Sequence, residues 1–272
     1  MTRQPAERGY TVWLALVFTF ALCAALAAAA ALYPQADGAV LLRDEGTTVD
    51  ASHADQGYVM VRHTPVAKKL KMRITKGDQQ LTYDLASDDS YETFLLGFGS
   101  GSYKIQVFLQ VSGKRYSNDS SVNLDVELAD ETLPFLYPNQ YVHYTADSSA
   151  VAKAAELCGG LESPADRLSA VRKYVVKAIL YDYVRASTVT TGYLPVVDEV
   201  LAEGKGICFD YAALTACMLR TQGIPTKLVI GYADTIYHAW NEVWIDGEWQ
   251  RIDTTAEANH MKVKKYTDER VY

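Results

Sequence analysis

The sequence is poor in cysteine, and its cysteines do not form the closely spaced pairs typical of zinc ribbons and thioredoxin-like sites. Its 272 residues include four cysteines, Cys23, Cys158, Cys208 and Cys217. No two of them stand in a CxxC pair, so we predict no metal site and no cofactor. Cys23 lies in an apolar N-terminal segment, which leaves an odd number of cysteines downstream. At least one thiol is therefore expected to be free or paired with another chain.

The sequence also lacks an excess of basic residues. It has 26 Lys and Arg against 33 Asp and Glu, for a net charge of −7. A mildly acidic chain gives no electrostatic reason to expect a nucleic-acid partner. The hydrophobic fraction of 49% and the charged fraction of 22% exclude a disordered chain, and the length allows two modest domains. We attribute the 19 tyrosines to the fold rather than to chemistry.

Charge is absent from the long N-terminal stretch between Gly9 and Ala36, which follows Arg3 and Arg8. This pattern predicts that residues 1–37 are a signal peptide or a membrane anchor, with an N-terminal hydrophobic helix. An alanine run at 28–30 supplies a cleavage site, whereas the length favours an anchor, so both remain open. Basic residues before the apolar stretch place the rest of the chain outside the cytoplasm, secreted or anchored through an N-terminal membrane contact.

The next part of the chain, residues 38–132, has the alternation of apolar and polar residues that is typical of β-strands. Turn-rich spacers such as Lys76-Gly77-Asp78 separate the alternating runs, which predicts hairpins in a small antiparallel β-sandwich domain. No group of catalytic residues stands out in it, so a binding or spacer role is expected. The predicted strands are residues 58–63, 69–74, 80–85, 103–111 and 121–128.

After Pro134 the pattern becomes helical, and residues 133–272 are predicted to form a second domain of the α+β class. A helix is expected over residues 148–157, ending at Gly159-Gly160. A second helix should begin at Ser163-Pro164, because proline is favoured in the first helical turn.

Cys208 follows a glycine-flanked loop and is expected to begin an apolar helix that ends near Arg220, before Gly223 and Pro225. A helix N-terminus offers unpaired N–H groups and the positive end of the helix dipole. Both favour the thiolate, and the same N–H groups can stabilise an oxyanion beside the sulfur. Cys217, nine residues on, and Cys158, at a helix end, are interpreted as core residues.

Three strand segments follow, over residues 227–232, 238–245 and 249–255. The Asp246-Gly247 pair between the last two predicts a tight hairpin. His238 opens one strand of this hairpin, and Asp253 lies at the end of its partner. Antiparallel pairing can bring the two together, so that the carboxylate orients the imidazole.

These residues resemble the transglutaminase-like superfamily over roughly residues 140–258. The resemblance rests on a series of short motifs in order, which are Gly206-Ile207-Cys208, residues 220–225, Gly231-Tyr232, residues 238–243 and residues 249–255. It implies a papain-like core, with Cys208 as nucleophile, His238 as general base and acid, and Asp253 as the orienting carboxylate. The chain as a whole looks like exported proteins of Gram-positive bacteria. It has no twelve-residue calcium-loop pattern, so calcium activation is not expected.

The implied reaction is thiol-dependent acyl transfer on a peptide or a glutamine carboxamide. An amine acceptor would make the enzyme a transglutaminase, and water would make it a cysteine protease or amidase. Cell-wall peptides are a candidate substrate for an exported enzyme. One alternative is an inactive surface module that binds a partner and retains the fold. A metal site built from Cys208 and His238 ranks last, because no paired-ligand motif accompanies them.

The second donor to the oxyanion cannot be assigned from the sequence. Tyr181, Tyr183 and Tyr193 precede Cys208, and packing is the favoured role for each. Asp210 and Tyr211 lie close to the helix start and are expected to line the cleft.

Overall fold

The computed structural model describes residues 33–272. The predicted N-terminal hydrophobic helix, and all but five residues of the predicted leader 1–37, lie outside the described residues. Between residues 33 and 272, no helix combines the length and the apolar character that crossing a bilayer requires. Membrane contact and an extracytoplasmic location stay predictions.

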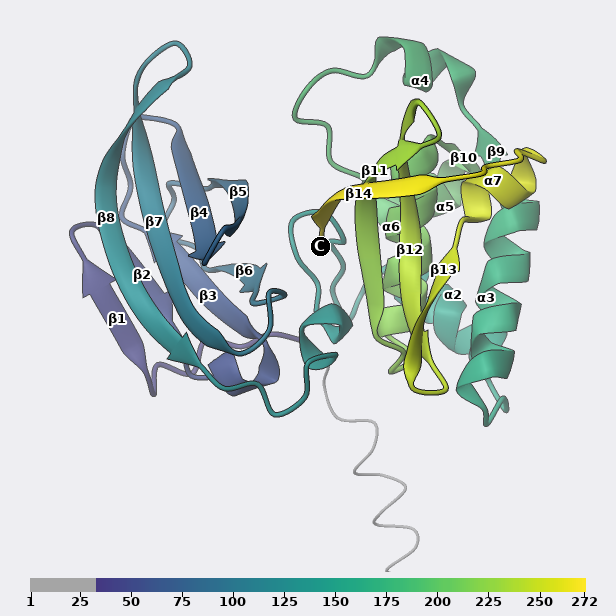
Figure 1. The fold of residues 1–272 in the computed structure, drawn as a ribbon, viewed down its shortest axis with the longest axis horizontal. Helices are drawn as coiled ribbons and strands as arrows, with labels where there is room; N and C mark the ends of the chain where they lie inside the picture. Colours follow the sequence, from purple (N-terminus) through teal and green to yellow (C-terminus); the bar gives the residue numbers. More distant parts are fainter. Residues whose placement is uncertain (1–32) are drawn as a thin grey trace, which may run out of the picture. The chain divides into compact units, whose positions relative to one another are not determined.

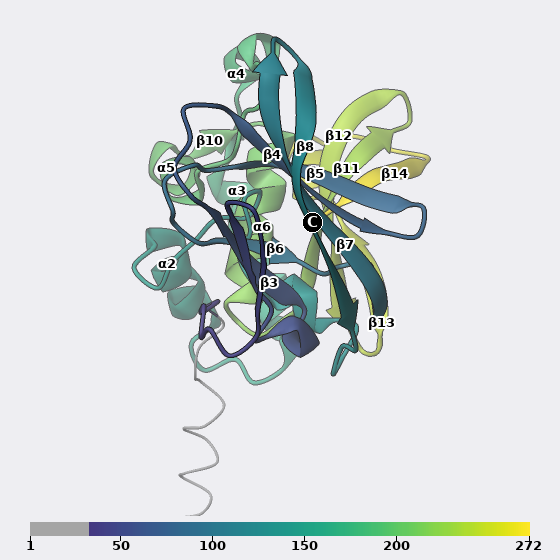
Figure 2. The same cartoon turned by 90° about the vertical axis from the view of Figure 1, so that its left-hand side faces the viewer.

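The first half of the described chain consists of two four-stranded antiparallel sheets, ordered β1-β2-β3-β6 and β5-β4-β7-β8. Their inward-facing side chains, such as Val59, Met72 and Ile105, are almost fully buried in one core. The longest hairpin is formed by β7 and β8 (Figures 1 and 2). The strands are Leu41–Asp44 (β1), Thr47–Asp50 (β2), Tyr58–His63 (β3), Leu70–Lys76 (β4), Gln79–Leu85 (β5), Glu92–Leu95 (β6), Gly101–Ser112 (β7) and Arg115–Val126 (β8), with a 3-10 helix at Ala54–Gln56 (η1).

The five predicted strands are confirmed as β3, β4, β5, β7 and β8, whereas β1, β2 and β6 are additional. Residues 33–272 form one compact unit, which is not divided at residue 132. The predicted boundary between two domains at that residue stays a prediction.

The second half combines helices with a sheet of order β13-β12-β11-β14, which is antiparallel throughout. Its elements are Leu133–Leu136 (η2), Ser149–Cys158 (α2), Pro164–Ala178 (α3), Leu180–Tyr181 (β9), Tyr183–Thr188 (α4), Val197–Glu203 (α5), Lys205–Gly206 (β10), Cys208–Arg220 (α6), Thr226–Ala233 (β11), Ile236–Ile245 (β12), Glu248–Ile252 (β13), Thr254–Ala258 (α7) and Tyr266–Val271 (β14).

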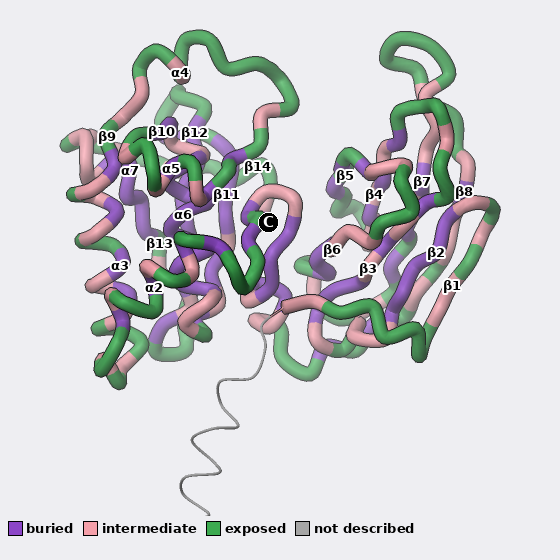
Figure 3. The backbone as a smooth tube through the Cα atoms, turned by 180° about the vertical axis from the view of Figure 1, so that it is seen from behind, coloured by how far each residue is buried: buried purple, intermediate pink, exposed green. Residues whose placement is uncertain are grey.

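Helix α6 is the centre of this half. It packs on β11 and β12 on one side and on α2, α3 and α5 on the others, and every residue from Asp210 to Arg220 is buried (Figure 3). This burial on all sides explains why the segment is apolar around its whole circumference. By contrast, α4 and the loop after it are largely exposed.

Local sequence signals set several element ends. Helix α3 begins at Pro164 as predicted, and the Ser163 hydroxyl caps it by accepting from Asp166 N over 3.0 Å. Asp246 and Gly247 both have positive φ, as a tight hairpin turn between β12 and β13 requires. The predicted strand 249–255 is wrong at its end, because β13 stops at Ile252 and α7 begins at Thr254.

The end of α6 is tied to distant segments by Arg220, which is completely buried. Its guanidinium donates to the carbonyl oxygens of Thr226 (2.8 Å), Tyr137 (2.6 Å) and Tyr272 (2.8 Å). Burial lowers the pKa of Arg220 to about 10. The Tyr272 ring also stacks on Tyr141, with centroids 3.8 Å apart.

Candidate active site

Cys208 is the first residue of α6, as predicted, and its side chain is partly exposed. It follows β10, which pairs in parallel with β9 and so fixes the backbone just before the sulfur. The N–H of Ile207 donates to the Asp210 carboxylate over 2.8 Å. Because the first N–H groups of a helix have no intrahelical acceptor, those of Cys208 and Phe209 remain available beside the sulfur.

Asp210 supports the start of α6 from within the protein. It is fully buried, and the hydroxyl of Tyr193 donates to its Oδ1 over 2.6 Å, while Arg185 Nη1 lies 3.5 Å from its Oδ2. Burial raises the pKa of Asp210. The expectation that Asp210 lines the cleft is therefore wrong. Asp210 is the third residue of α6, and its carboxylate accepts from the N–H of Ile207, so it caps the start of the helix.

His238 and Asp253 are neighbours across the β12–β13 hairpin. Asn241 pairs with Ile252, so the next residue, Asp253, lies opposite Trp240. Trp240 and His238 are two residues apart on β12, so Asp253 lies on the same face of the sheet as His238. This diagonal relation brings His238 Nε2 within 2.8 Å of Asp253 Oδ2. The two residues are only 4% and 7% exposed. The Trp240 ring, which is also buried, stacks near the imidazole at a centroid distance of 6.2 Å.

The Asp253 carboxylate is held on both oxygens. Oδ1 accepts from Ala256 N over 2.8 Å and thereby caps α7. Oδ2 accepts from the hydroxyl of Tyr266 over 2.9 Å, in addition to its bond with His238. The carboxylate is thus fixed in one orientation toward the imidazole.

Tyr266 is a site residue that the sequence did not reveal. It begins β14, which pairs with β11 through an irregularity between Ile230 and Gly231. A Cβ atom at Gly231 would lie 2.1 Å from the Thr267 carbonyl oxygen, so this close approach requires glycine. The Tyr266 ring packs edge-on against Trp240, with ring centroids 4.9 Å apart.

The electrostatics of the site favour a protonated imidazole. Burial alone lowers the pKa of His238, but the hydrogen bond and charge of Asp253 and the neighbouring Cys208 sulfur outweigh it and raise that pKa to about 9. With Nε2 engaged by Asp253, Nδ1 is the ring nitrogen left to exchange a proton with the sulfur. The structure therefore brings Cys208, His238 and Asp253 together.

The other two cysteines of residues 33–272 differ sharply from Cys208. Cys158 and Cys217 are 5% and 0% exposed. Burial raises the pKa of both thiols, which holds them in the unreactive form. Their interpretation as core residues is confirmed. In the same part of the chain, no three His, Cys, Asp or Glu side chains are arranged to hold a metal ion.

Exposed apolar side chains occur on two segments next to the site. Tyr183 and Val184 of α4 are 72% and 74% exposed, and Tyr183 packs against Tyr181, which pairs with Gly206 just before Cys208. Ile236 and Tyr237, directly before His238, are 56% and 50% exposed.

Comparison with known proteins identifies the domain that carries this site. Residues 151–254 match the family model of the transglutaminase-like superfamily. An uncharacterised protein of Mycobacterium leprae is 28% identical over 118 residues, which is 39% of this chain and 40% of the relative.

Two solved structures are similar as well. One, described as a TGase, is 24% identical over 39% of this chain and 30% of its own, with a TM-score of 0.34. The other, a candidate cysteine protease from Cytophaga hutchinsonii, is 14% identical over 86% of this chain and 81% of its own, with a TM-score of 0.41. The chain thus spans well under half of the Mycobacterium leprae relative and of the TGase.

Proposed function

Since residues 151–254 belong to the transglutaminase-like superfamily, we propose that this protein is a cysteine enzyme that transfers acyl groups from peptide or glutamine carboxamide substrates. The observation that carries the proposal is the buried 2.8 Å hydrogen bond between His238 and Asp253, next to a partly exposed cysteine at a helix N-terminus. A purely structural cysteine has no need of an oriented imidazole. This argues against an inactive module.

In the proposed reaction, His238 Nδ1 takes the proton of the Cys208 thiol, and the thiolate attacks the carbonyl carbon. The N–H groups of Cys208 and Phe209 stabilise the oxyanion of the tetrahedral intermediate. His238 then protonates the leaving amine, and a thioester remains on Cys208. Asp253 keeps the imidazole oriented and stabilises its charged form.

An acceptor then attacks the thioester carbonyl carbon, and His238 takes the acceptor's proton. The carbon–sulfur bond breaks, which releases the product and restores the Cys208 thiolate. If the acceptor is an amine, the enzyme is a transglutaminase; if it is water, the enzyme is a protease or amidase. Exposed Tyr183 and Tyr237 near the site support a peptide or protein substrate, because aromatic side chains give peptides large apolar contacts. The uncharged N-terminal stretch supports membrane attachment or secretion, where cell-wall peptides are candidate substrates.

The first test measures the reactivity of each cysteine. The full-length protein is treated with limiting iodoacetamide at pH 7, and the labelled residues are located by mass spectrometry. Cys208 should react at least about tenfold faster than Cys158 and Cys217. The variant His238→Ala should remove that advantage, with His143→Ala, at an exposed histidine, as the matched control. Equal reactivity of Cys208 in the His238→Ala variant would refute the proposed activation.

The second test distinguishes the acceptors. Acylated Cys208 is followed by mass spectrometry with a glutamine-containing peptide, with and without a primary amine. An amide of the added amine indicates transglutaminase activity, whereas release of free acid alone indicates hydrolysis. The failure of both, with an activated Cys208, would point to a different acyl donor.

A further inference from the structure

Exposed apolar side chains are concentrated around the candidate active site. Among residues 33–272, eleven large apolar side chains are exposed. Six of them lie in residues 180–196 and three in residues 232–237, so nine of the eleven occupy two short segments. Single exposed apolar residues are normal on a protein surface, whereas a cluster of them marks an interaction site. We call six of these residues the apolar rim: Leu180, Tyr183 and Val184 on the first segment, and Tyr232, Ile236 and Tyr237 on the second.

The first segment is held beside Cys208 by the backbone. In the parallel pairing of β9 with β10, Tyr181 lies opposite Gly206. One extended residue separates Gly206 from Cys208, so the side chains of Tyr181 and Cys208 emerge on the same face. The Tyr181 ring meets the exposed Tyr183 ring edge-on, with ring centroids 4.9 Å apart. The first segment therefore begins on the face of the fold that carries the sulfur.

The second segment leads directly into His238. Ile236 and Tyr237 are the first two residues of β12, and Tyr232 on β11 lies opposite Tyr237. The two tyrosine rings meet edge-on with centroids 5.6 Å apart, and the Arg270 guanidinium donates to the Tyr237 hydroxyl. Figures 1 and 2 show the turn between β11 and β12 at the same end of the helix-containing half as α4. The candidate nucleophile and His238 are thus each adjacent to an exposed apolar segment.

Charged residues within the two segments are engaged by the protein itself. Only Asp182, Arg185 and Asp234 are charged there. The guanidinium of Arg185 donates to Glu203 over 2.8 Å and lies 3.8 Å from the Asp182 carboxylate. The Asp234 carboxylate accepts from the backbone N–H of Lys265 over 3.0 Å. A charged side chain of a bound molecule would therefore find no free partner of opposite sign in these segments.

The chemistry of the apolar rim selects an apolar peptide over other occupants. Leu180, Val184 and Ile236 offer no hydrogen-bonding groups, so the hydroxyls of a sugar would stay unpaired against them. Surfaces that bind membranes are rich in Lys and Arg, whereas Arg185 is the one basic residue of the two segments and is already engaged. A peptide that places a carbonyl carbon on the Cys208 sulfur passes both segments.

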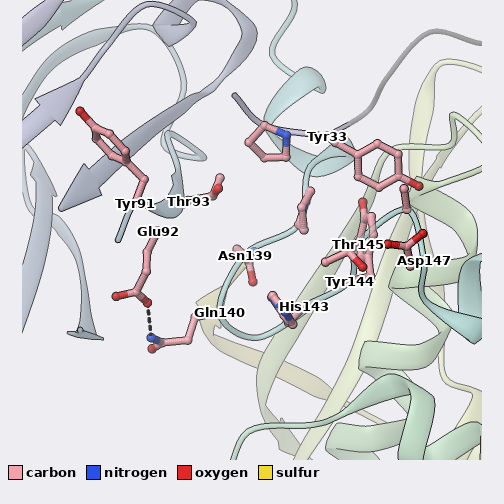
Figure 4. Close-up of a pocket in the computed structure, with 13 residues that line it drawn as sticks. Tyr33, Tyr91, Glu92, Thr93, Asn139, Gln140, His143, Tyr144, Thr145 and Asp147 are labelled. Atoms are coloured by element: carbon pink, nitrogen blue, oxygen red, sulfur yellow. Dashed lines mark hydrogen bonds between the residues drawn. The ribbon is translucent and has the colours of Figure 1, made fainter. Parts of the chain in front are cut away.

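We propose that the apolar rim binds neutral, apolar residues on both sides of the carboxamide that reacts with Cys208. This inference rests on the proposed function, because it defines the substrate class of the same site. The edge-on tyrosine pairs are already formed, so a peptide packs on them with little loss of side-chain freedom. A separate cavity, whose lining includes Tyr33, Tyr91 and His143, shares no residue with the apolar rim (Figure 4). Changes in the rim therefore leave that cavity intact.

The test measures how fast Cys208 of the full-length protein reacts with peptides that carry an electrophile. The probe is acetyl-Leu-X-Leu-amide, in which X is 2,4-diaminobutyric acid with an iodoacetyl group on its side chain. The Cys208 sulfur forms a bond to the iodoacetyl carbon, and iodide leaves. Matched probes carry Ser, Glu or Lys in place of both Leu residues. Each rate is divided by the rate for iodoacetamide, and mass spectrometry locates the label.

The Leu probe should react at least about tenfold faster than the Ser, Glu and Lys probes, relative to iodoacetamide. Val184→Ser and Ile236→Ser, both at exposed positions, should each reduce this preference by about threefold. Val111→Ser is the matched control, because Val111 is 58% exposed in β7, outside both segments. It should leave the preference unchanged.

Equal relative rates for the Leu and Ser probes would overturn the proposal, as would a preference that survives Val184→Ser and Ile236→Ser together. Self-association, or binding to phosphatidylglycerol vesicles, that is lost in these variants while no Leu preference exists would also overturn it. The rim would then be an interface between copies of the chain or a membrane contact. The iodoacetamide rate tests the proposed function separately. If Cys208 reacts no faster than Cys158, its activation is refuted, whereas a preference for the Leu probe would still support the rim.

Discussion

The raised pKa of His238 makes protein stability depend on pH in a defined direction. The pKa rises from its ordinary value of 6.5 to about 9 in the folded protein. The folded state therefore holds this proton more tightly than the unfolded state does. The resulting stabilisation is fully present below about pH 6.5 and is lost as the pH rises through about 9. Its full size is about 3 kcal/mol, since each pH unit of difference corresponds to about 1.4 kcal/mol.

The assay is urea unfolding at pH 6 and at pH 9.5, followed by tryptophan fluorescence. Other groups titrate in this range, so the quantity of interest is the difference between the wild type and His238→Gln. The free energy of unfolding of the wild type should fall by about 3 kcal/mol more than that of the variant. Asp253→Asn should remove most of this excess, and Cys208→Ser a smaller part. Parallel pH dependence of wild type and His238→Gln would refute the buried ion pair.

Three further predictions concern residues around the site. Tyr266→Phe removes a donor to Asp253 and should slow alkylation of the candidate nucleophile at pH 7 by about twofold to tenfold. Tyr116→Phe, in β8 and away from the site, is the control and should leave the rate unchanged. An unchanged rate in Tyr266→Phe would mean that the hydroxyl does not position the carboxylate. Arg220→Lys keeps the charge but loses the planar fork of donors, so the free energy of unfolding in urea should fall by about 2–4 kcal/mol. A fall of less than about 1 kcal/mol would contradict this prediction. Gly231→Ala forces a methyl group against the β14 backbone and should lower the free energy of unfolding by about 1–3 kcal/mol in the same assay. An unchanged free energy would mean that β14 can shift to make room for the methyl group.

The parts of the fold that could be predicted are those where one face is buried and the other exposed. Strand β5 alternates in burial from Leu81 to Leu85, so its period of two is visible in the sequence. Strand β2, Thr47–Asp50, is buried at every position although three of its four residues are polar, which gives no alternation to detect. Its Thr47 hydroxyl is satisfied by Ser120 at 2.6 Å, a contact 73 residues away. Burial of this kind depends on tertiary structure.

The three residues of the proposed triad could be singled out from the sequence, because each lies next to a local signal. Cys208 begins an apolar helix, and His238 and Asp253 lie on either side of the Asp-Gly turn of one hairpin. Thr254 and Thr255 have β-branched side chains and favoured a strand, but the Asp253 cap and packing against the core make them helical.

Tyr266 could not be found in the same way. Strand β14 has four consecutive exposed positions, Thr267 to Arg270, and lacks an apolar pattern. Its position depends on pairing with β11, more than thirty residues earlier, at a glycine that permits the close approach. Neither condition leaves a local trace in the sequence.

The unequal exposure of the three candidate catalytic side chains imposes a kinetic order on the proposed enzyme. His238 and Asp253 are nearly inaccessible, so solvent reaches the site through the partly exposed Cys208. A second substrate then has to approach the thioester by the path along which the first product leaves. The proposed enzyme is therefore expected to follow a double-displacement scheme, in which the first product leaves before the second substrate binds. Reciprocal plots of rate against donor concentration, at a series of fixed amine concentrations, would be parallel lines.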